Sequence, residues 1–353
     1  MYQLGTLTNA VNVTASLRWR NISNSIHIVL SRTTFADMKA VRVTKEGPST
    51  QVTVEEVPKP SIKNGEFLVK IRASSVQPAD ILNSTGGFPI TTFPRTLGKD
   101  FTGTVVEGPD KWKGRDVYGT SGSTFSFTED GAQAEFAVLR KDCVAPMPNN
   151  TSFAQAAAIG TPFTTALTAL QRARTKSSNT VMVLGATGSV GSAVMQIARG
   201  MGCATIGVGR RGTDINSMED PGLSKAKDLT DGKGPDVVVD TVGDFALTKA
   251  AFEVLASRGR LSIITAPRQD TTELPIDIKA LYRRQVELIG CNTASSSQAE
   301  MASMMSELTP HFESEKLNAP DESTRSLVGI DRALEVYSAK VKRAVIVFGS
   351  SSL

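Results

Sequence analysis

The feature that most constrains the fold is a glycine-spaced turn between an apolar run and a helical pattern, within residues 180–202. Val181 to Leu184 is a short apolar run, which is typical of a buried strand in a parallel sheet. Gly185, Gly188 and Gly191 follow, and small apolar residues then recur at helical spacing. A strand, a tight glycine turn and a helix form the first half of a dinucleotide-binding unit. The pattern therefore predicts an α/β fold with a nucleotide site at this turn. A glycine turn in a ligand-free α/β protein is the alternative.

Two of the three glycines of the turn have an expected task. Gly188 lets the backbone approach a pyrophosphate, and Gly191 lets the helix pack against the strand. The N-terminus of the helix offers free N–H groups and a partial positive charge to the phosphates. Ala186 departs from the pattern, because it stands where the first glycine of the fingerprint usually lies.

Length and composition exclude several classes of protein. A chain of 353 residues is too long for one compact core, which favours two domains. Hydrophobic residues make up 40% and charged residues 21%, and the net charge is only +4, so the chain is globular without a basic face for nucleic acid. No apolar stretch reaches the length of a membrane span. We therefore expect a small-molecule partner.

Cysteine and histidine are scarce. Cys143, Cys203 and Cys291 lie far apart and follow neither disulfide nor metal-ligand spacing, which indicates a reduced compartment. The only histidines are His27 and His311. A metal centre is therefore not expected.

Residues 1–37 differ from the rest of the chain. Through Ala36 they contain Arg18, Arg20 and Arg32 but no acidic residue, and they are rich in Ser, Thr and Asn. This bias is similar to that of a mitochondrial presequence. The favoured interpretation is an upstream extension of the gene model and a cytoplasmic protein, since helical amphipathicity is poor; a mitochondrial location is the alternative.

From Met38 to about residue 150 the pattern is β-rich, with turns at Gly47-Pro48 and Pro58-Lys59-Pro60. After Phe153 helical segments alternate with apolar β-runs, which predicts a doubly wound parallel sheet. The segment between Arg211 and Asp236 is too short for a full crossover, so we expect a short or irregular edge strand.

The end of the second strand of this sheet indicates the cofactor. An NAD-binding unit has an acidic residue here, whereas this chain has Arg210 and Arg211 after Gly209. Two guanidinium groups suit a 2′-phosphate through forked, charge-assisted hydrogen bonds, so the sequence predicts NADPH. Two solvated arginines at a strand end are the alternative.

Several motifs in order resemble the medium-chain dehydrogenase/reductase superfamily, and most closely its zinc-free quinone oxidoreductase (zeta-crystallin-like) branch. They are residues 75–80, 97–103, 161–166, 185–191 and 236–243. The resemblance extends from Met38 to about Phe348. It implies a homodimer and a GroES-like β-rich catalytic domain beside a Rossmann domain. The expected ranges are 1–37 for the N-terminal extension, 38–159 for the catalytic domain, 160–295 for the NADPH-binding domain and 296–353 for a C-terminal segment that returns to the catalytic domain.

Zinc alcohol dehydrogenases of this superfamily hold the catalytic metal with an early cysteine and a histidine in a Gly-His-Glu segment. The matching segments here are 74–77, which has no cysteine, and Gly98-Lys99-Asp100, which has lysine in the place of histidine. The four-cysteine lobe of the family is also missing. Because zinc needs thiolate or imidazole ligands at suitable spacing, we expect no metal.

The resemblance also implies the active-site residues. Gln77 and Asp80 match positions that line the cleft, whereas Leu82 and Ser84 replace a tyrosine and an arginine that are frequent there. Lys99 is a candidate to polarise an oxygen or donate a proton; the alternative is a lysine paired structurally with Asp100 or another acid. Asp80 has the alternative task of fixing the local loop.

The expected cofactor-binding residues come from the strand ends and the domain junction. They are Thr161, Thr165, Ala186, Thr187, Gly188, Ser189, Val190, Gly191, Arg210, Arg211, Thr241, Val242, Ala266, Pro267, Cys291 and Asn292.

Together these features predict an NADPH-dependent, zinc-independent oxidoreductase. Without a metal to polarise it, the small-molecule electron acceptor must already be activated, as a quinone or an α,β-unsaturated carbonyl is. Two alternatives stay open: a non-catalytic NADPH-binding, redox-sensing protein and an enoyl-thioester reductase.

Overall fold

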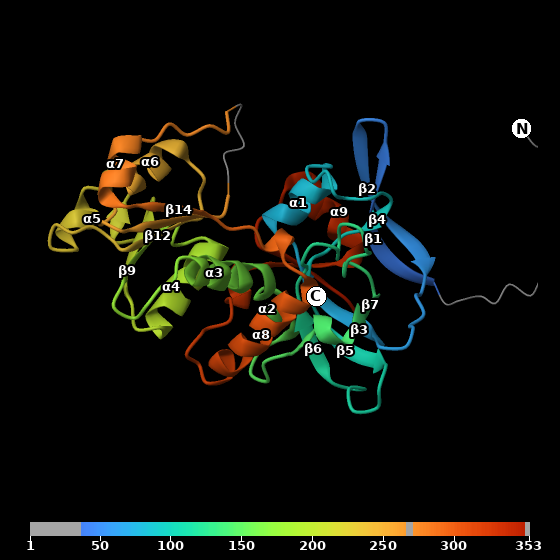
Figure 1. Cartoon of the computed structure of the whole chain (residues 1–353). Helices are drawn as coiled ribbons and strands as arrows, with labels where there is room; N and C mark the ends of the chain where they lie inside the picture. Colours follow the sequence, from blue (N-terminus) through green and yellow to red (C-terminus); the bar gives the residue numbers. More distant parts are fainter. Residues whose placement is uncertain (1–36, 266–270, 350–353) are drawn as a thin grey trace, which may run out of the picture. The chain divides into compact units, whose positions relative to one another are not determined.

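The structure, a computed structural model, describes residues 37–265 and 271–349 (Figure 1). The expected extension 1–37 therefore lies, apart from Asp37, outside the described residues, and so do Ala266 and Pro267. The predicted fold class is confirmed: a β-rich part is followed by a parallel sheet with helices on both faces. Across the described parts of the chain, no helix has the length and apolarity needed to cross a membrane.

The β-rich part contains one antiparallel sheet and one mainly antiparallel sheet in which β15 and β16 pair in parallel. β1 (Asp37–Glu46) and β2 (Ser49–Pro58) pair along their whole length, and β1 also pairs with β4 (Arg95–Thr96). The second sheet has the order β15-β16-β3-β5-β6-β8, and β7 pairs with β3. Its strands are β3 (Glu66–Ser75), β5 (Asp100–Glu107), β6 (Asp116–Gly119), β7 (Phe136–Arg140), β8 (Ala145–Pro146), β15 (Ser326–Gly329) and β16 (Ala344–Val347).

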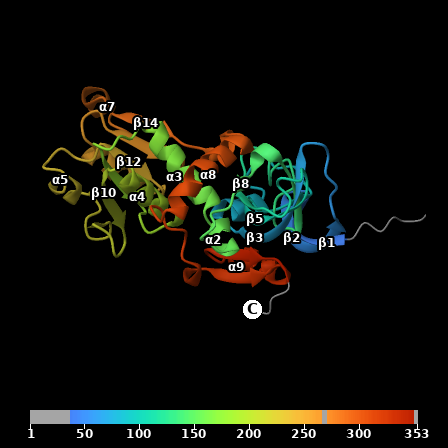
Figure 2. The same cartoon turned by 90° about the horizontal axis from the view of Figure 1, so that it is seen from below.

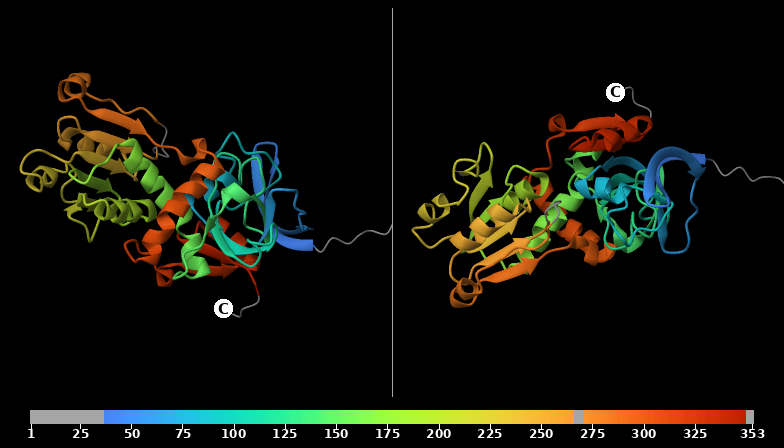
Figure 3. Two further views of the ribbon diagram at one scale, coloured as in Figure 1. Left: turned by 60° about the horizontal axis from the view of Figure 1, so that its bottom comes forward. Right: turned by 90° about the horizontal axis from the view of Figure 1, so that it is seen from above.

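The parallel sheet has the strand order β11-β10-β9-β12-β13-β14. Its strands are β9 (Thr180–Leu184), β10 (Ala204–Gly209), β11 (Ile215–Asn216), β12 (Val237–Asp240), β13 (Arg260–Ile263) and β14 (Glu287–Gly290). Helices cover both faces, as the views in Figures 2 and 3 show. One face packs against α3 (Gly160–Arg172), α4 (Ser189–Gly200) and α8 (Gln298–Glu313), and the other against α5 (Lys225–Asp228), α6 (Phe245–Val254) and α7 (Ile278–Arg284).

Burial on both faces explains why the strands read as continuous apolar runs. In β9, Val181 and Val183 point to the face covered by α3 and α4. Met182 and Leu184 point to the opposite face, among residues of α5 and α6. Since alternate side chains of a strand face opposite sides, a strand between two helical layers has to be apolar at every position.

The edge strand β11 has only two residues and follows β10 after a five-residue connection without a helix. Two contacts hold this connection: Asp214 Oδ2 accepts a hydrogen bond of 2.7 Å from Gly207 N, and Gly209 O accepts one of 2.8 Å from Ser217 N. The predicted short, irregular edge strand is confirmed. The Asp214 side chain thus accepts a backbone hydrogen bond in place of part of the strand pairing that a longer β11 would supply.

After α8 the chain returns to the β-rich part. β16 pairs antiparallel with β3, parallel β15 lies beside it, and the red C-terminal end in Figure 1 therefore lies next to β3. The remaining elements are the helices α1 (Pro78–Ser84), α2 (Phe153–Ala157) and α9 (Ala333–Ala339) and the short 3-10 helices η1 (Lys141–Cys143), η2 (Thr293–Ser295), η3 (Glu322–Thr324) and η4 (Ile330–Arg332).

We predict that Gly191 is required for the packing of α4 on β9. A Cβ at this position would lie 2.1 Å from Gly185 O, so Gly191→Ala must displace the helix or the turn. We expect a loss of about 1–3 kcal/mol in the free energy of unfolding, measured by chemical denaturation. Gly200→Ala in the same helix is the matched control, because a Cβ there meets nothing within 4 Å. It should cost nothing, and an equal loss in both variants would contradict the steric explanation.

Candidate active site

The glycine turn after β9 has the geometry of a phosphate-binding turn. Gly185 has φ +77°, and its carbonyl accepts a hydrogen bond of 2.9 Å from Gly188 N. Gly185 N and Ala186 N both donate to Val208 O, at 2.9 and 3.0 Å, which ties the turn to β10. Gly188 is the N-cap of α4, and no side chain caps this helix. The amides of its first turn are therefore available to an anion.

Two arginines from the C-terminal segment reach the same turn. Arg343 Nη2 donates to Thr187 O at 3.1 Å. Arg325 and Arg343 line a cavity of about 190 Å³ together with Ser189 and Ser192 of α4. Arg325 Nε is buried without a hydrogen-bond partner, and burial together with the charge of Arg343 lowers the pKa of Arg325. Within 37–265 and 271–349, no carboxylate lies within 4.0 Å of either guanidinium. Asp321 also lines this cavity, and its charge raises the pKa of Arg325, so the two guanidinium groups face one carboxylate that does not pair with either within 4.0 Å.

A buried carboxylate, Asp100, lies at the start of β5 and joins it to α3. Its Oδ1 accepts hydrogen bonds from Thr120 Oγ1 (2.5 Å), Thr161 N (2.9 Å) and Thr161 Oγ1 (2.7 Å). Its Oδ2 accepts one from Gln77 Nε2 at 2.8 Å. Burial raises the pKa of Asp100 above its usual range, while the four donors oppose this shift by stabilising the ionised form.

Asp80 and Gln77 lie at the N-terminus of α1. Asp80 Oδ2 accepts a hydrogen bond of 2.8 Å from Gln77 N, so the carboxylate caps the helix, as the structural alternative for Asp80 expected. Its Oδ1 is buried without a hydrogen-bond partner. Burial raises the pKa of Asp80 to about 6, against the opposing effect of the Lys99 charge. The Gln77 amide also donates to Ser75 Oγ at 3.2 Å, so its N–H groups are used within the protein.

Lys99 is buried with 4% of its surface accessible, and its ammonium group lies on two aromatic rings. Nζ is 4.4 Å from the ring centroid of Phe127 and 4.6 Å from that of Phe88. In the described parts of the chain, no hydrogen bond or ion pair joins Nζ to another residue. The expected alternative is a lysine paired structurally with Asp100 or another acid, but among the described residues no carboxylate oxygen lies within 4.0 Å of Nζ. Burial lowers the pKa of Lys99, and the charges of Asp80 and Asp100 raise it.

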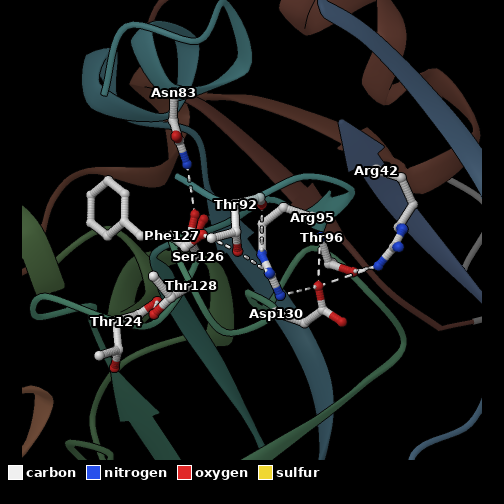
Figure 4. Close-up of polar contacts among 10 residues, drawn as sticks. All are labelled: Arg42, Asn83, Thr92, Arg95, Thr96, Thr124, Ser126, Phe127, Thr128 and Asp130. Carbon is white, nitrogen blue, oxygen red and sulfur yellow. Dashed lines mark hydrogen bonds and ion pairs between the residues drawn. The ribbon is translucent and has the colours of Figure 1, made fainter. Parts of the chain in front are cut away.

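The loop that carries Phe127 is fixed from two sides (Figure 4). Asn83 Nδ2 of α1 donates to Ser126 O at 2.6 Å, and Thr92 N donates to Phe127 O at 3.0 Å. At the end of the loop, Asp130 Oδ1 accepts hydrogen bonds from Arg42, Arg95 and Thr96 N. These contacts hold the backbone that carries Phe127, and its ring packs edge-to-face on Phe88 with the centroids 5.1 Å apart.

Comparison with known proteins agrees with this arrangement. Residues 63–149 match the family described as "Alcohol dehydrogenase GroES-like domain", and residues 189–309 match "Zinc-binding dehydrogenase". The chain is 43% identical over 303 residues to a zinc-type alcohol dehydrogenase-like protein of Schizosaccharomyces pombe, covering 85% of this chain and 93% of the relative. It is 29% identical over 279 residues to the quinone oxidoreductase of Rattus norvegicus, covering 74% and 82%. The fold matches that of an alcohol dehydrogenase superfamily protein from Novosphingobium aromaticivorans with a TM-score of 0.75 at 25% identity, covering 88% and 100%.

The chain belongs to the medium-chain dehydrogenase/reductase superfamily, in its quinone oxidoreductase-like branch. It is an oxidoreductase of this family, and the predicted GroES-like domain and Rossmann sheet are confirmed. The match to the cofactor-binding domain of the superfamily also supports a nicotinamide cofactor.

The two described segments of this medium-chain oxidoreductase that match the zinc-ligand segments of the metal-dependent members, 74–77 and 98–100, contain no cysteine and no histidine. In the described residues, no three His, Cys, Asp or Glu side chains gather to hold a metal ion. Ser75 Oγ accepts from Gln77, and the lysine at position 99 offers an ammonium group rather than an imidazole. Zinc favours thiolate, imidazole and carboxylate ligands, so the residues present do not fit this metal.

The structure brings several predicted cofactor residues to the glycine turn. A Cβ on Gly185 would lie 2.7 Å from Thr241 Oγ1 and 2.9 Å from Val242 Cγ2, so these residues lie against the turn. Thr241 Oγ1 donates to Leu184 O at 2.7 Å, and the side chain of Val242 is 46% exposed. Arg210 lies exposed directly after β10. Arg211 beside it is equally exposed.

Other predicted residues have structural tasks in this oxidoreductase. Asn292 caps η2, with Oδ1 accepting from Ala294 N at 3.0 Å and Nδ2 donating to Ser295 Oγ at 3.1 Å. Cys291 is buried at the end of β14, and Thr165 is buried on α3.

Three features were missed by the sequence analysis. Asp100 was considered only as a partner of Lys99, although its place directly after Lys99 in a family motif was a usable signal. The phenylalanine cage (Phe88 and Phe127 around Lys99) and the pair of Arg325 and Arg343 could not be found, because these residues lie outside the motifs and meet them only in the fold.

We predict that Asp80 makes the protein less stable as the pH rises from about 4 to about 6. The folded protein keeps the Asp80 proton until about pH 6, whereas an unfolded chain releases it near pH 4. The folded state therefore binds more protons in this range, and the free energy of unfolding falls as the pH rises. Asp80→Asn should remove this part of the pH dependence in denaturant titrations at pH 4.5, 5.5 and 6.5. An unchanged slope in the variant would show that Asp80 ionises normally.

Proposed function

We propose that this protein is an NADPH-dependent, zinc-independent reductase that transfers hydride to a quinone or an α,β-unsaturated carbonyl. The observation that carries the proposal is the buried Lys99, which lies on two phenylalanine rings at the position matching a zinc ligand of the family. Lys99 supplies a cation at the position that matches a zinc ligand of the metal-dependent members. An ammonium group polarises an oxygen more weakly than zinc does. An acceptor whose π-system already spreads charge onto oxygen suits such a site.

The residues around the glycine turn support the proposed binding of the cofactor phosphates. The free amides of α4, together with Arg325 and Arg343, are arranged to bind a pyrophosphate. Arg210 and Arg211 are exposed at the end of β10, where a 2′-phosphate requires cations. When bound, the nicotinamide supplies hydride; the protein holds it against the acceptor and excludes water.

Asp214, the acidic residue nearest in sequence to this end of β10, already accepts a hydrogen bond from the backbone. Asp214 Oδ2 accepts from Gly207 N at 2.7 Å and closes the connection to β11. A carboxylate that is used in this way is a poor partner for ribose hydroxyls, which supports NADPH over NADH.

The wall of the site on α1 favours an apolar acceptor. Leu82 is exposed at 43%, whereas Ser84 is buried and donates to Ile81 O at 2.8 Å. Neither residue presents a polar group to the substrate, which supports a small enone or enal over a polar quinone. The homodimer implied by the family resemblance and a cytoplasmic location stay predictions.

The proposal predicts NADPH oxidation by purified protein with an activated acceptor. Four acceptors separate the candidate functions: 1,4-naphthoquinone, an enone, an enoyl thioester and a saturated ketone as the control. We expect turnover with the enone or the quinone and none with the ketone, because only a conjugated acceptor spreads the developing charge. Turnover only with the thioester would support the enoyl reductase. Nucleotide binding without any turnover would support the non-catalytic alternative.

The two arginines after β10 should determine the cofactor preference. Replacing both, Arg210→Asp with Arg211→Ser, removes two charge-assisted hydrogen bonds and should raise the KM for NADPH at least about tenfold while leaving that for NADH unchanged or lower. Arg283→Ser is the matched control, since Arg283 is equally exposed but lies on α7. If both variants keep the wild-type preference, the assignment of the 2′-phosphate is wrong.

A further inference from the structure

The two aromatic rings that contact the ammonium group of Lys99 belong to two separate turns of the chain. Nζ lies 4.6 Å from the ring centroid of Phe88 and 4.4 Å from that of Phe127. The Phe88 turn (residues 88–91) closes with a hydrogen bond of 3.1 Å from Thr91 N to Phe88 O. The Phe127 turn (residues 124–128) closes with one of 2.8 Å from Thr128 N to the first residue of the turn. The position of the ammonium group therefore depends on how these two turns are placed relative to one another.

One buried side chain, that of Asn83, contacts both turns. Its Oδ1 accepts a hydrogen bond of 2.5 Å from Thr91 Oγ1 in the Phe88 turn. Its Nδ2 donates to Ser126 O in the Phe127 turn at 2.6 Å (Figure 4). A carboxamide can accept and donate at the same time, and Asn83 is fully buried in the last turn of α1. Both ring-bearing turns are thus attached to the same point of one helix.

The contacts of Asn83 add to a single direct hydrogen bond between the turns, from Thr92 N to Phe127 O at 3.0 Å. One bond between two turns lets them pivot about it, whereas the Asn83 side chain connects them at a second point and restricts this motion. The backbone of Ser126 also indicates a constraint, because its φ is +66°, in the left-handed region. A residue other than glycine keeps such a conformation only where its surroundings determine it, and such residues are frequent at functional sites.

We propose that Asn83 is a positioning residue of the reductase: it joins the two phenylalanine-bearing turns and so sets where the ammonium group of Lys99 meets the oxygen of the acceptor. This inference rests on the proposed function, in which Lys99 polarises that oxygen. A lysine has a flexible four-carbon chain, so its charge has to be placed by the groups around it. Displacement of a reacting group by about 1 Å can lower a rate about a hundredfold, and a contact that orients the rings therefore acts on kcat.

The first test measures how well Lys99 is covered, on the full chain without nucleotide or acceptor. The folded protein is treated with acetic anhydride, and acetylation of each lysine is followed by mass spectrometry. In the wild type Lys99 should react more slowly than the exposed Lys233, because only 4% of the Lys99 surface is accessible. Asn83→Ala should raise the rate at Lys99 at least about fivefold, which is the effect of one lost hydrogen bond on an opening equilibrium, and leave the rate at Lys233 unchanged. An unchanged rate at Lys99 overturns the proposal.

Asn150→Ala is the matched control. Asn150 Nδ2 donates to Phe312 O at 3.0 Å, so the variant loses the same kind of hydrogen bond between two segments that carry neither ring. It should leave the acetylation rate of Lys99 at the wild-type value. A rise as large as that in Asn83→Ala would mean that general loosening of the fold uncovers Lys99, and it would overturn the proposal.

A second variant, Thr91→Val, keeps the test decisive if Asn83→Ala does not fold. It replaces the hydroxyl that donates to Asn83 Oδ1 by a methyl group of similar size and so releases the Phe88 turn alone. Acetylation of Lys99 should again be faster than in the wild type. A wild-type rate at Lys99 in Thr91→Val overturns the proposed connection between the turns.

Steady-state kinetics with NADPH and cyclohexenone test the role in the reaction. Asn83→Ala should lower kcat per folded molecule at least about tenfold, because the charge that polarises the acceptor is displaced. The KM for NADPH should stay within about twofold of the wild-type value, since the glycine turn belongs to the parallel-sheet part of the chain. A role in stability alone would lower the amount of folded protein and leave kcat per folded molecule unchanged. Faster acetylation of Lys99 together with a wild-type kcat therefore overturns the positioning role.

The labelling separates this inference from the proposed function. Faster acetylation of Lys99 in Asn83→Ala, with no NADPH oxidation by the wild type and any acceptor, supports the connection between the turns and overturns the reductase. NADPH oxidation by the wild type, with an unchanged acetylation rate of Lys99 in Asn83→Ala, supports the reductase and overturns the task of Asn83.

Discussion

The interaction on which the site depends is the set of four hydrogen bonds to the buried carboxylate of Asp100. They hold Thr161 of α3, Thr120 and the amide of Gln77 around the first residue of β5. Four donors allow a carboxylate to be buried at an acceptable free energy. Among the described residues no ion pair within 4.0 Å joins Lys99 to Asp100, and the ammonium group lies on the rings of Phe88 and Phe127 instead. The electrostatics of the site therefore follow from a structural contact.

The nucleotide end depends on a second long-range constraint, the pairing of β16 with β3. This pairing brings the last strand back to the β-rich part, and Arg343 directly precedes that strand. Its hydrogen bond to Thr187 O joins the returning segment to the glycine turn. A change in the β16–β3 register would therefore move a cation relative to the helix N-terminus, although the two segments lie more than 150 residues apart in sequence.

The sequence predicted the elements with strong local signals and missed those that depend on tertiary contacts. Glycine spacing and apolar runs located β9, the turn and α4, and the short segment before Asp236 indicated the truncated edge strand. A motif also drew attention to Lys99, but the direct pair with an acid that was its structural alternative is not observed among the described residues. Nothing in the local sequence shows that Asp100 accepts four hydrogen bonds from other donors or that two phenylalanines, one on each side of Lys99 in sequence, close over the ammonium group. Such information lies in the packing of loops, which periodicity does not encode.

The buried charges also show how the fold holds a lysine at the position that matches a zinc ligand of the family. Replacing a metal by a lysine removes fixed ligand bonds, and the position of Nζ then has to be fixed by its surroundings. Here Phe127 is held through its backbone by Thr92, and its neighbour Ser126 by Asn83, so one wall of the cage is rigid before any substrate is present. Asp80, in contrast, keeps Oδ1 without a hydrogen-bond partner. Burial raises the pKa of this carboxyl to about 6, and the charge of Lys99 opposes the shift. The unsatisfied oxygen is therefore the feature of this region that packing alone does not explain.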